Sequence, residues 1–230
     1  ETNPALLGIS FNVEPGELLA IAGNSGSGKT TIAKLVLGLY RPQAGAISLD
    51  GIDIRQLRPV SLRQTLAYVP QRNHAFPGSI YDNIALADPT ASFNQIQDAC
   101  AMAGLTRTIE ALPQGFDTVF RDGMQAHVPQ GFLRQVALAR AFLRDAPVMI
   151  LDEPASGLDD LDEQVFMKTL ENLHGTRTIL MITQRPSHMR MCDRVLMLDH
   201  GQIKAMGTPE EVLGSPRPSA ETVIVGVGND

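Results

Sequence analysis

A glycine-rich stretch near the N-terminus constrains this chain more than any other feature. It reads Gly23-Asn24-Ser25-Gly26-Ser27-Gly28-Lys29-Thr30-Thr31. An apolar run at residues 18–22 precedes it, and residues 32–38 follow it with helical spacing. A strand, a glycine loop and a helix, in that order, are the context in which the pattern G-x-x-x-x-G-K-[ST] forms a phosphate-binding P-loop.

Each residue type in this loop has a chemical reason to be there. Glycines let backbone N–H groups turn toward phosphate oxygens, because no Cβ stands in the way. The start of the following helix adds donors and the positive end of the helix dipole. Lys29 is expected to reach the β- and γ-phosphates, and the hydroxyl of Thr30 to bind Mg²⁺. The chain is therefore predicted to bind a nucleoside triphosphate through Gly23, Asn24, Ser25, Gly26, Ser27, Gly28, Lys29, Thr30 and Thr31.

Length and composition set the broad class. The chain has 230 residues, 43% hydrophobic and 19% charged, which is ordinary for a globular protein with one large domain or a domain and a subdomain. A net charge of −6 argues against nucleic acid as a partner. No apolar run of 18 residues is present, so no segment is expected to span a bilayer.

The ends and the cysteines suggest a processed, intracellular chain. The start, Glu1-Thr2-Asn3-Pro4, lacks an initiator methionine and is not a signal peptide. Cys100 and Cys192 lie far apart without metal-ligand spacing, which predicts unpaired thiols in a reducing compartment, the cytoplasm. No histidine has metal-ligand spacing either, and all five are expected on the surface or in loops: His74, His127, His174, His188 and His200.

The first third of the chain reads as short strands joined by turns. Strands are expected at residues 6–13, 46–49 and 66–69, and Pro70-Gln71 follows the last of them. From here the chain resembles the ATP-binding cassette (ABC) ATPases. In that family a glutamine after such a strand contacts Mg²⁺ and the attacking water, and links the core to a helical subdomain. Gln71 is the matching residue.

Two strings resemble exporters within that family. Residues 76–84 resemble the pattern F-x-G-[ST]-I-x-[DE]-N-I, a region that in exporters seats the coupling helices of the membrane domain. Taken singly, Phe76 and Ile80 could equally be core contacts at a turn. Residues 112–118 resemble the "LPxGYDT" of type I secretion and peptide exporters. Helical spacing at residues 92–103, with Gly104 as its cap, fits a helical subdomain between them.

The family's signature motif, L-S-G-G-Q, is altered in this chain. Residues 132–141 resemble the helix that follows the signature. Counting back from Val136 places the motif on residues 128–132, whereas counting forward from residues 116–118 places it on 127–131. The two counts differ by one residue, which suggests a one-residue insertion. Both lack the serine and break the glycine pair, and Pro129 has no N–H, so the signature is degenerate.

A second apolar run carries the acidic residues that the nucleotide site needs. Residues 148–151 read as a buried parallel strand, which ends in Asp152-Glu153. Asp152 is expected to hold Mg²⁺, directly or through water, and Glu153 to orient or deprotonate the attacking water. Residues 156–159 resemble the family's D-loop, S-x-L-D, and residues 161–173 read as an amphipathic helix.

The last motif is altered at one residue. A buried strand at residues 178–183 leads to Gln184, where the family usually has its switch histidine. A neutral amide donates a hydrogen bond to a γ-phosphate but carries no proton. A hairpin is expected at residues 194–207, then a short helix capped by Thr208, and residues 215–230 read as a mobile tail.

The resemblance covers about residues 6–213. It implies an α/β fold: a P-loop NTPase, RecA-like core at residues 1–71 and 147–214, with an antiparallel β part at the N-terminus and an inserted helical subdomain at 72–146. Family members form head-to-tail dimers, in which each ATP lies between one P-loop and the partner's signature. The aromatic residue that stacks on adenine would lie upstream of Glu1.

Three functions compete. The first is the ATPase domain of an ABC exporter, using ATP and Mg²⁺ at the cytoplasmic face of the inner membrane. Its partners would be the transmembrane domain of the same transporter and a second nucleotide-binding domain, identical or different. The second is a regulatory nucleotide-binding domain with little hydrolysis, favoured by the altered signature and Gln184. The third, a soluble ABC protein of translation or repair, is disfavoured by residues 76–84 and by the acidic charge.

Overall fold

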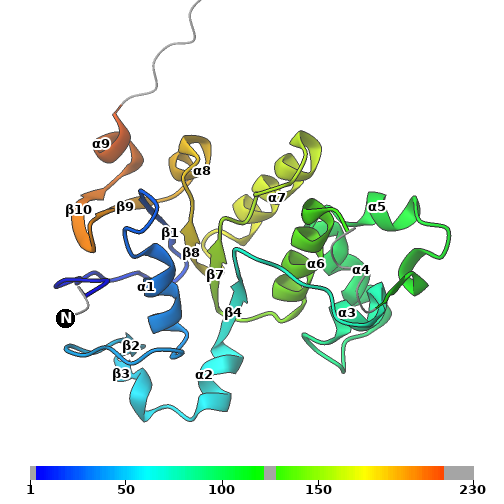
Figure 1. Cartoon of the computed structure of the whole chain (residues 1–230), viewed down its shortest axis with the longest axis horizontal. Helices are drawn as coiled ribbons and strands as arrows, with labels where there is room; N and C mark the ends of the chain where they lie inside the picture. The colour runs from blue at the N-terminus through cyan, green and yellow to red at the C-terminus, as the bar shows by residue number, and fades with distance from the viewer. Residues whose placement is uncertain (1–3, 122–127, 215–230) are drawn as a thin grey trace, which may run out of the picture.

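A six-stranded sheet forms the centre of the computed structural model, which describes residues 4–121 and 128–214. The strand order is β10-β9-β1-β8-β7-β4 (Figure 1). Every neighbouring pair is parallel except the hairpin of β9 and β10. The strands are β1 (Leu18–Gly23), β4 (Leu66–Val69), β7 (Val148–Asp152), β8 (Thr178–Ile182), β9 (Arg194–Asp199) and β10 (Gln202–Gly207). The strands expected at residues 66–69, 148–151 and 178–183 and the terminal hairpin are confirmed.

Alternation along the strands divides the core into two layers. In β1, Leu18, Ala20 and Ala22 pack in the cluster that contains α6 (Gln130–Leu143) and α7 (Asp160–Leu173). Leu19 and Ile21 pack on the other face, with α1 (Lys29–Val36). Successive strand side chains point to opposite faces, so a sheet covered by helices on both sides needs apolar residues at every position.

The helices between β4 and β7 gather at one end of the molecule. Figure 1 shows α3, α4 and α5 grouped around α6, beside the sheet. Their bounds are α3 (Ile80–Ala85), α4 (Phe93–Met102) and α5 (Thr106–Glu110). A capping box between Ser92 and Gln95 starts α4, and Gly104 follows it with φ +70°. The helix expected at residues 92–103 is therefore confirmed. A two-residue ladder of β5 (Gly78–Ser79) and β6 (Val119–Phe120) closes this region.

The expected strand at residues 6–13 is wrong. The segment forms no ladder, although Leu6, Ile9, Phe11 and Val13 pack on the layer that contains α1. Alternation predicts an apolar face, but a strand also needs a neighbour to pair with. Across residues 6–13, all of which the structure describes, the one backbone–backbone hydrogen bond runs from Leu7 N–H to the Gly201 carbonyl (2.7 Å). The described antiparallel part is the hairpin of β2 (Ser48–Leu49) and β3 (Ile52–Asp53), shorter than the strand expected at 46–49.

The remaining elements are short. They are the 3₁₀ turns η1 (Ile54–Gln56) and η2 (Gly115–Asp117), and the helices α2 (Pro59–Thr65), α8 (Pro186–Arg190) and α9 (Pro209–Leu213). Thr208 caps α9 with a complete capping box, as expected. Within residues 4–121 and 128–214, no helix is long and apolar enough to cross a membrane. His127 and the tail at 215–230 lie outside the described residues.

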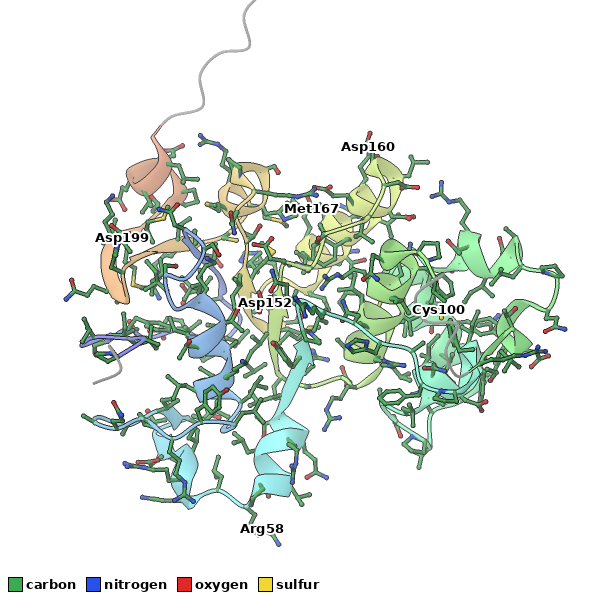
Figure 2. The ribbon with its side chains drawn as sticks, viewed as in Figure 1. Arg58, Cys100, Asp152, Asp160, Met167 and Asp199 are labelled. Carbon is green, nitrogen blue, oxygen red and sulfur yellow. The ribbon has the colours of Figure 1, made fainter. Side chains whose placement is uncertain are left out.

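The cysteines follow the prediction, and one histidine does not. Cys100, which lies among the helices in Figure 2, and Cys192 are buried free thiols, and burial raises the pKa of each to about 12. His188 is buried at 1% exposure, so its placement on the surface or in a loop is wrong. It lies on the buried side of α8, where its ring packs 6.2 Å from that of Phe166.

Candidate nucleotide-binding site

The predicted site residues follow the carboxyl ends of four parallel strands. The glycine loop follows β1, Asp152 and Glu153 end β7, Gln184 follows β8, and Gln71 follows β4. Carboxyl ends of parallel strands meet at one edge of a sheet, where ligands bind in open α/β folds. Figure 2 shows Asp152 at the centre of the molecule, beside α1.

The loop conformation requires glycine at two positions. Gly23 has φ +144°, and a Cβ on it would lie 2.3 Å from the carbonyl oxygen of Leu198 in β9. Gly28 has φ +105°, and a Cβ on it would lie 2.4 Å from Cδ2 of Leu6. A side chain at Gly23 would collide with the backbone of β9, and one at Gly28 would have to displace Leu6 and would be strained at this φ. These glycines are therefore needed for the packing around the loop as well as for the binding of phosphate.

The lysine of the loop already lies inside it. Lys29 Nζ donates to the carbonyl oxygens of Gly23 (2.7 Å) and Asn24 (2.8 Å). Its burial lowers its pKa, while the charges of Glu153 and Asp152 oppose that shift. The ammonium group thus lies inside the loop, where it donates to two carbonyl oxygens, and a bound phosphate would become its acceptor instead.

Thr30 and Asp152 meet across the sheet edge. The hydroxyl of Thr30 donates to Oδ2 of Asp152 over 3.1 Å. Burial raises the pKa of Asp152, and the Thr30 bond and the charges of Arg134 and Lys29 oppose the shift. A hydroxyl and a carboxylate oxygen are hard ligands of the kind that Mg²⁺ prefers, and the two converge here at the foot of the phosphate loop. The residues present therefore fit a Mg²⁺–nucleotide.

Glu153 stands in an uncommon backbone conformation. Its φ is +49°, and its N–H donates to the carbonyl of Ile182 at the end of β8 (2.9 Å). Burial, followed by the charge of Asp152, raises the pKa of its carboxyl group. A carboxylate with a raised pKa is a better proton acceptor, which suits a general base.

The two glutamines expected at the site follow β4 and β8 at the same edge of the sheet. The side chains of Gln71 and Gln184 are both exposed. Gln184 stands between Thr183, which is buried, and Arg185, whose N–H donates to the Thr183 hydroxyl (3.1 Å). The structure thus brings Lys29, Thr30, Asp152 and Glu153 together and leaves the side chains of the two glutamines exposed.

Arg134 is a residue of this site that the sequence analysis missed. Its guanidinium group is buried in α6 and donates to the carbonyl oxygens of Pro70 (2.8 Å), Gln71 (2.7 Å) and Asp152 (3.3 Å). It therefore holds the turn after β4 against the end of β7. An arginine set among the apolar residues of a helical run was the available signal, since a buried guanidinium group needs hydrogen-bond partners.

The start of α6 agrees with a degenerate signature. Pro129 occupies the N-cap and provides no side-chain hydrogen bond to the helix. The next glycine is packed against the D-loop, because a Cβ on Gly131 would lie 2.2 Å from the carbonyl oxygen of Gly157. Gly131 is thus the glycine of the motif that this chain retains, at the point where the start of α6 contacts the backbone of Gly157.

The exporter-like segment at residues 76–84 is held together by hydrogen bonds of one buried side chain. Asn83, buried in α3, bonds both the N–H and the carbonyl of Phe76 (2.7 and 2.8 Å) and the carbonyl of Ser79 (2.9 Å). Arg140 of α6 donates to the Asn83 carbonyl (2.6 Å) and lies 5.2 Å from the ring of Phe76. Ile80 is fully buried, a core contact, whereas Phe76 is 54% exposed.

Comparisons with known proteins agree with this geometry. The sequence model of the family described as "ABC transporter" matches residues 6–156. The chain is 41% identical over 210 residues to the ATP-dependent lipid A-core flippase of Haemophilus influenzae (strain 86-028NP), covering 91% of this chain and 36% of the flippase. It is 36% identical over 195 residues to a "Probable ABC transporter ATP-binding/permease protein" of Haemophilus influenzae (strain ATCC 51907 / DSM 11121 / KW20 / Rd), covering 85% and 35%.

A solved structure gives the same result. A bacterial Atm1-family ABC exporter with ATP bound superposes with a TM-score of 0.86 at 35% identity, over 91% of this chain and 36% of that chain. The chain spans about a third of the length of the curated relatives it matches. With the P-loop, the Asp152-Glu153 strand end and the inserted helices in the family's order, the chain belongs to the ABC transporter family.

Proposed function

We propose that this chain is the nucleotide-binding domain of an ABC exporter, binding MgATP at the cytoplasmic face of the membrane. Its partners are the transmembrane domain of the same transporter and a second nucleotide-binding domain, identical or different. The observation that carries the proposal is the convergence of Thr30 on Asp152 beside a lysine already enclosed by the glycine loop. The exporter-like string at residues 76–84 supports the membrane partner.

The residues divide the chemistry among them. Lys29 and the N–H groups of the loop bind the phosphates. Thr30, Asp152 and Gln71 would hold Mg²⁺, whose charge neutralises the phosphate oxygens. Glu153 orients the attacking water and accepts its proton, which its raised pKa favours. Gln184 donates a hydrogen bond from its amide to the γ-phosphate.

Two alterations favour slow hydrolysis. Pro129 at the start of α6 replaces a capping hydroxyl and an N–H that would face the partner's γ-phosphate. Gln184 cannot carry a proton, and proton transfer by a positioned side chain is typically worth about 10²–10⁴ in rate. We therefore expect tight MgATP binding with slow turnover.

The relatives support an exporter in general, whereas the resemblance of residues 112–118 pointed to type I secretion and peptide exporters. The relatives reported above are named as a lipid A-core flippase and an ATP-binding/permease protein, and neither name mentions type I secretion. The site residues would bind ATP rather than cargo, so they support export without selecting what is exported.

Calorimetry and steady-state hydrolysis test the proposal together. The 230-residue chain is titrated with MgATP, and Lys29→Ala, which removes the loop ammonium, serves as the control that should lose binding. Turnover should be slow, and Glu153→Gln, which removes the proposed general base, should lower it further. Rapid hydrolysis that Glu153→Gln abolishes would contradict slow turnover, and no binding at all would overturn the nucleotide site.

A second candidate is a regulatory domain that pairs with a catalytic partner of different sequence. The observation in its favour is that the two alterations would fall in different composite sites of such a pair. Gln184→His should then raise turnover only when the partner brings an intact signature. A large gain for Gln184→His in a homodimer would contradict this candidate.

A further inference from the structure

We infer that Glu163 and His188 are positioning residues for Gln184, holding its loop against the end of β7. The inference rests on the proposed function, because it assigns support to a residue that faces the γ-phosphate there. Neither residue touches the nucleotide loop itself. Both lie behind Gln184, in α7 and α8.

One carboxylate joins the two sides of the Gln184 loop. Glu163 forms an ion pair with Arg185 through Oε2 and accepts from His188 Nε2 through Oε1 (2.8 Å). Both oxygens of the carboxylate are thereby used. Because Arg185 is next to Gln184 and His188 lies one helical turn beyond, the carboxylate fixes the chain just after Gln184.

The residue before Gln184, Thr183, is held by β1 and by the two partners of Glu163, Arg185 and His188. Thr183 is buried, its N–H donates to the Ile21 carbonyl of β1 (3.2 Å), and its hydroxyl accepts from Arg185 N–H (3.1 Å). The Nδ1 atom of His188 lies 3.5 Å from that hydroxyl. Gln184 is therefore held on both sides while its own side chain stays exposed.

The network also reaches the segment that carries Glu153. Arg185 donates to the carbonyl of Ala155, two residues after Glu153 (3.4 Å). The N–H of Glu153 donates to Ile182, at the end of the strand that leads to Gln184 (2.9 Å). The buried ring of His188 packs against Phe166 and bonds Glu163 at the same time, which a histidine on the surface would not do.

The test compares a triphosphate with a diphosphate, so that it does not depend on hydrolysis. Affinities of the 230-residue chain for Mg·AMP-PNP and Mg·ADP are measured by calorimetry for the parent, Glu163→Gln and His188→Gln, alone and combined with Gln184→Ala. A hydrogen bond to the γ-phosphate is made by AMP-PNP only. Glu163→Gln keeps the side-chain volume and is only partly buried, so it serves where His188→Gln unfolds.

Two matched variants serve as controls. Glu171→Gln makes the same change on the exposed face of α7, where Glu171 pairs only with Lys168 among the described ion pairs. His174→Gln changes an exposed histidine that bonds Asp193. Neither should alter the ratio of the two affinities.

Positioning predicts a definite pattern. Glu163→Gln and His188→Gln should each weaken AMP-PNP binding about tenfold and leave ADP binding unchanged, since a hydrogen bond to a charged group is lost. In the Gln184→Ala background neither should cause a further loss, because residues that act through one another are not additive. Equal losses for both nucleotides, full additivity, or no loss would overturn the inference. A parent chain that binds neither nucleotide would instead refute the proposed function.

Discussion

The guanidinium group of Arg134 lies 2.7 Å from the carbonyl oxygen of Gln71, which is 63 residues away in the sequence. The same group reaches the carbonyl of Asp152, so one buried side chain ties the turn after β4 to the strand end that would bind metal. The family's glutamine loop is thus held through its backbone, while the Gln71 side chain remains exposed.

Replacing Arg134 by methionine should lower the free energy of unfolding by about 2 kcal/mol, because three carbonyl groups lose the hydrogen-bond donor that this buried side chain supplies. Urea denaturation checks the change. Arg55→Met is the matched control, since Arg55 is exposed and pairs only with neighbouring Asp53 among the described contacts, and it should change stability by at most about 0.5 kcal/mol. Equal effects of the two variants would show that Arg134 is not a fastening point.

Gly201→Ala should weaken MgATP binding about tenfold, because the β9–β10 turn supports the glycine loop. Gly201 N–H donates to the Ser27 carbonyl (3.2 Å), and a Cβ on Gly201, at φ +75°, would lie 2.6 Å from the Ala5 carbonyl. Gly51→Ala carries the same left-handed strain at φ +78° with nothing within 4 Å. Calorimetric affinities of the two variants should therefore differ, and matching values would remove the turn from the site.

Glu153→Gln should stabilise the nucleotide-free chain and flatten its pH dependence. Burial and Asp152 raise the pKa of Glu153, so the folded state binds its proton more tightly than the unfolded state does. Stability from this group is present below the ordinary carboxyl pKa and is lost as pH rises through the raised value. At neutral pH the variant escapes that loss, and its melting temperature should rise by about 2–4 °C.

Thermal scans from pH 4 to pH 8 check this result, with Glu171→Gln as the exposed control. The gain over the parent should shrink as pH falls below the raised pKa, because the parent's carboxyl group is then neutral as well. A gain that stays constant across that range would refute the electrostatic cause.

Gly131→Ala should destabilise the fold although alanine is the better helix former. Its Cβ would lie 2.2 Å from the Gly157 carbonyl, which forces the start of α6 away from the D-loop. Overpacking of this kind costs typically about 1–3 kcal/mol, more than the ~1 kcal/mol that alanine gains over glycine in a helix. Gln130→Ala, at the exposed neighbouring position, is the control. Denaturant midpoints should fall for Gly131→Ala only.

Local patterns were enough to predict the centre of the fold. Continuous apolar runs such as residues 148–151 identify buried parallel strands, and the residues after them gather at one edge whatever the connections between them. The enclosure of Lys29 and the meeting of Thr30 with Asp152 follow from that topology. The capping residue Thr208 likewise predicted the start of α9 from sequence alone.

Long-range contacts account for what the sequence did not predict. Whether residues 6–13 form a strand depends on a pairing neighbour, which alternation does not reveal. The partners of Arg134 lie in two other segments, the turn after β4 and the end of β7, and those of His188 include a carboxylate in α7. A histidine without metal spacing looks like a surface residue until the packing against Phe166 is known.

The helix α6 carries two arginines with different targets. Arg134 bonds the sheet edge where ATP would bind, and Arg140 contacts Asn83 and Phe76 in the segment of residues 76–84. Six residues of helix separate them, a rise of about 9 Å at 1.5 Å per residue. A helical segment this short bends little, so a tilt of α6 at Arg134 also moves the helix at Arg140. The helix α6 therefore couples the two sites mechanically, because Arg134 and Arg140 lie less than two turns apart on it.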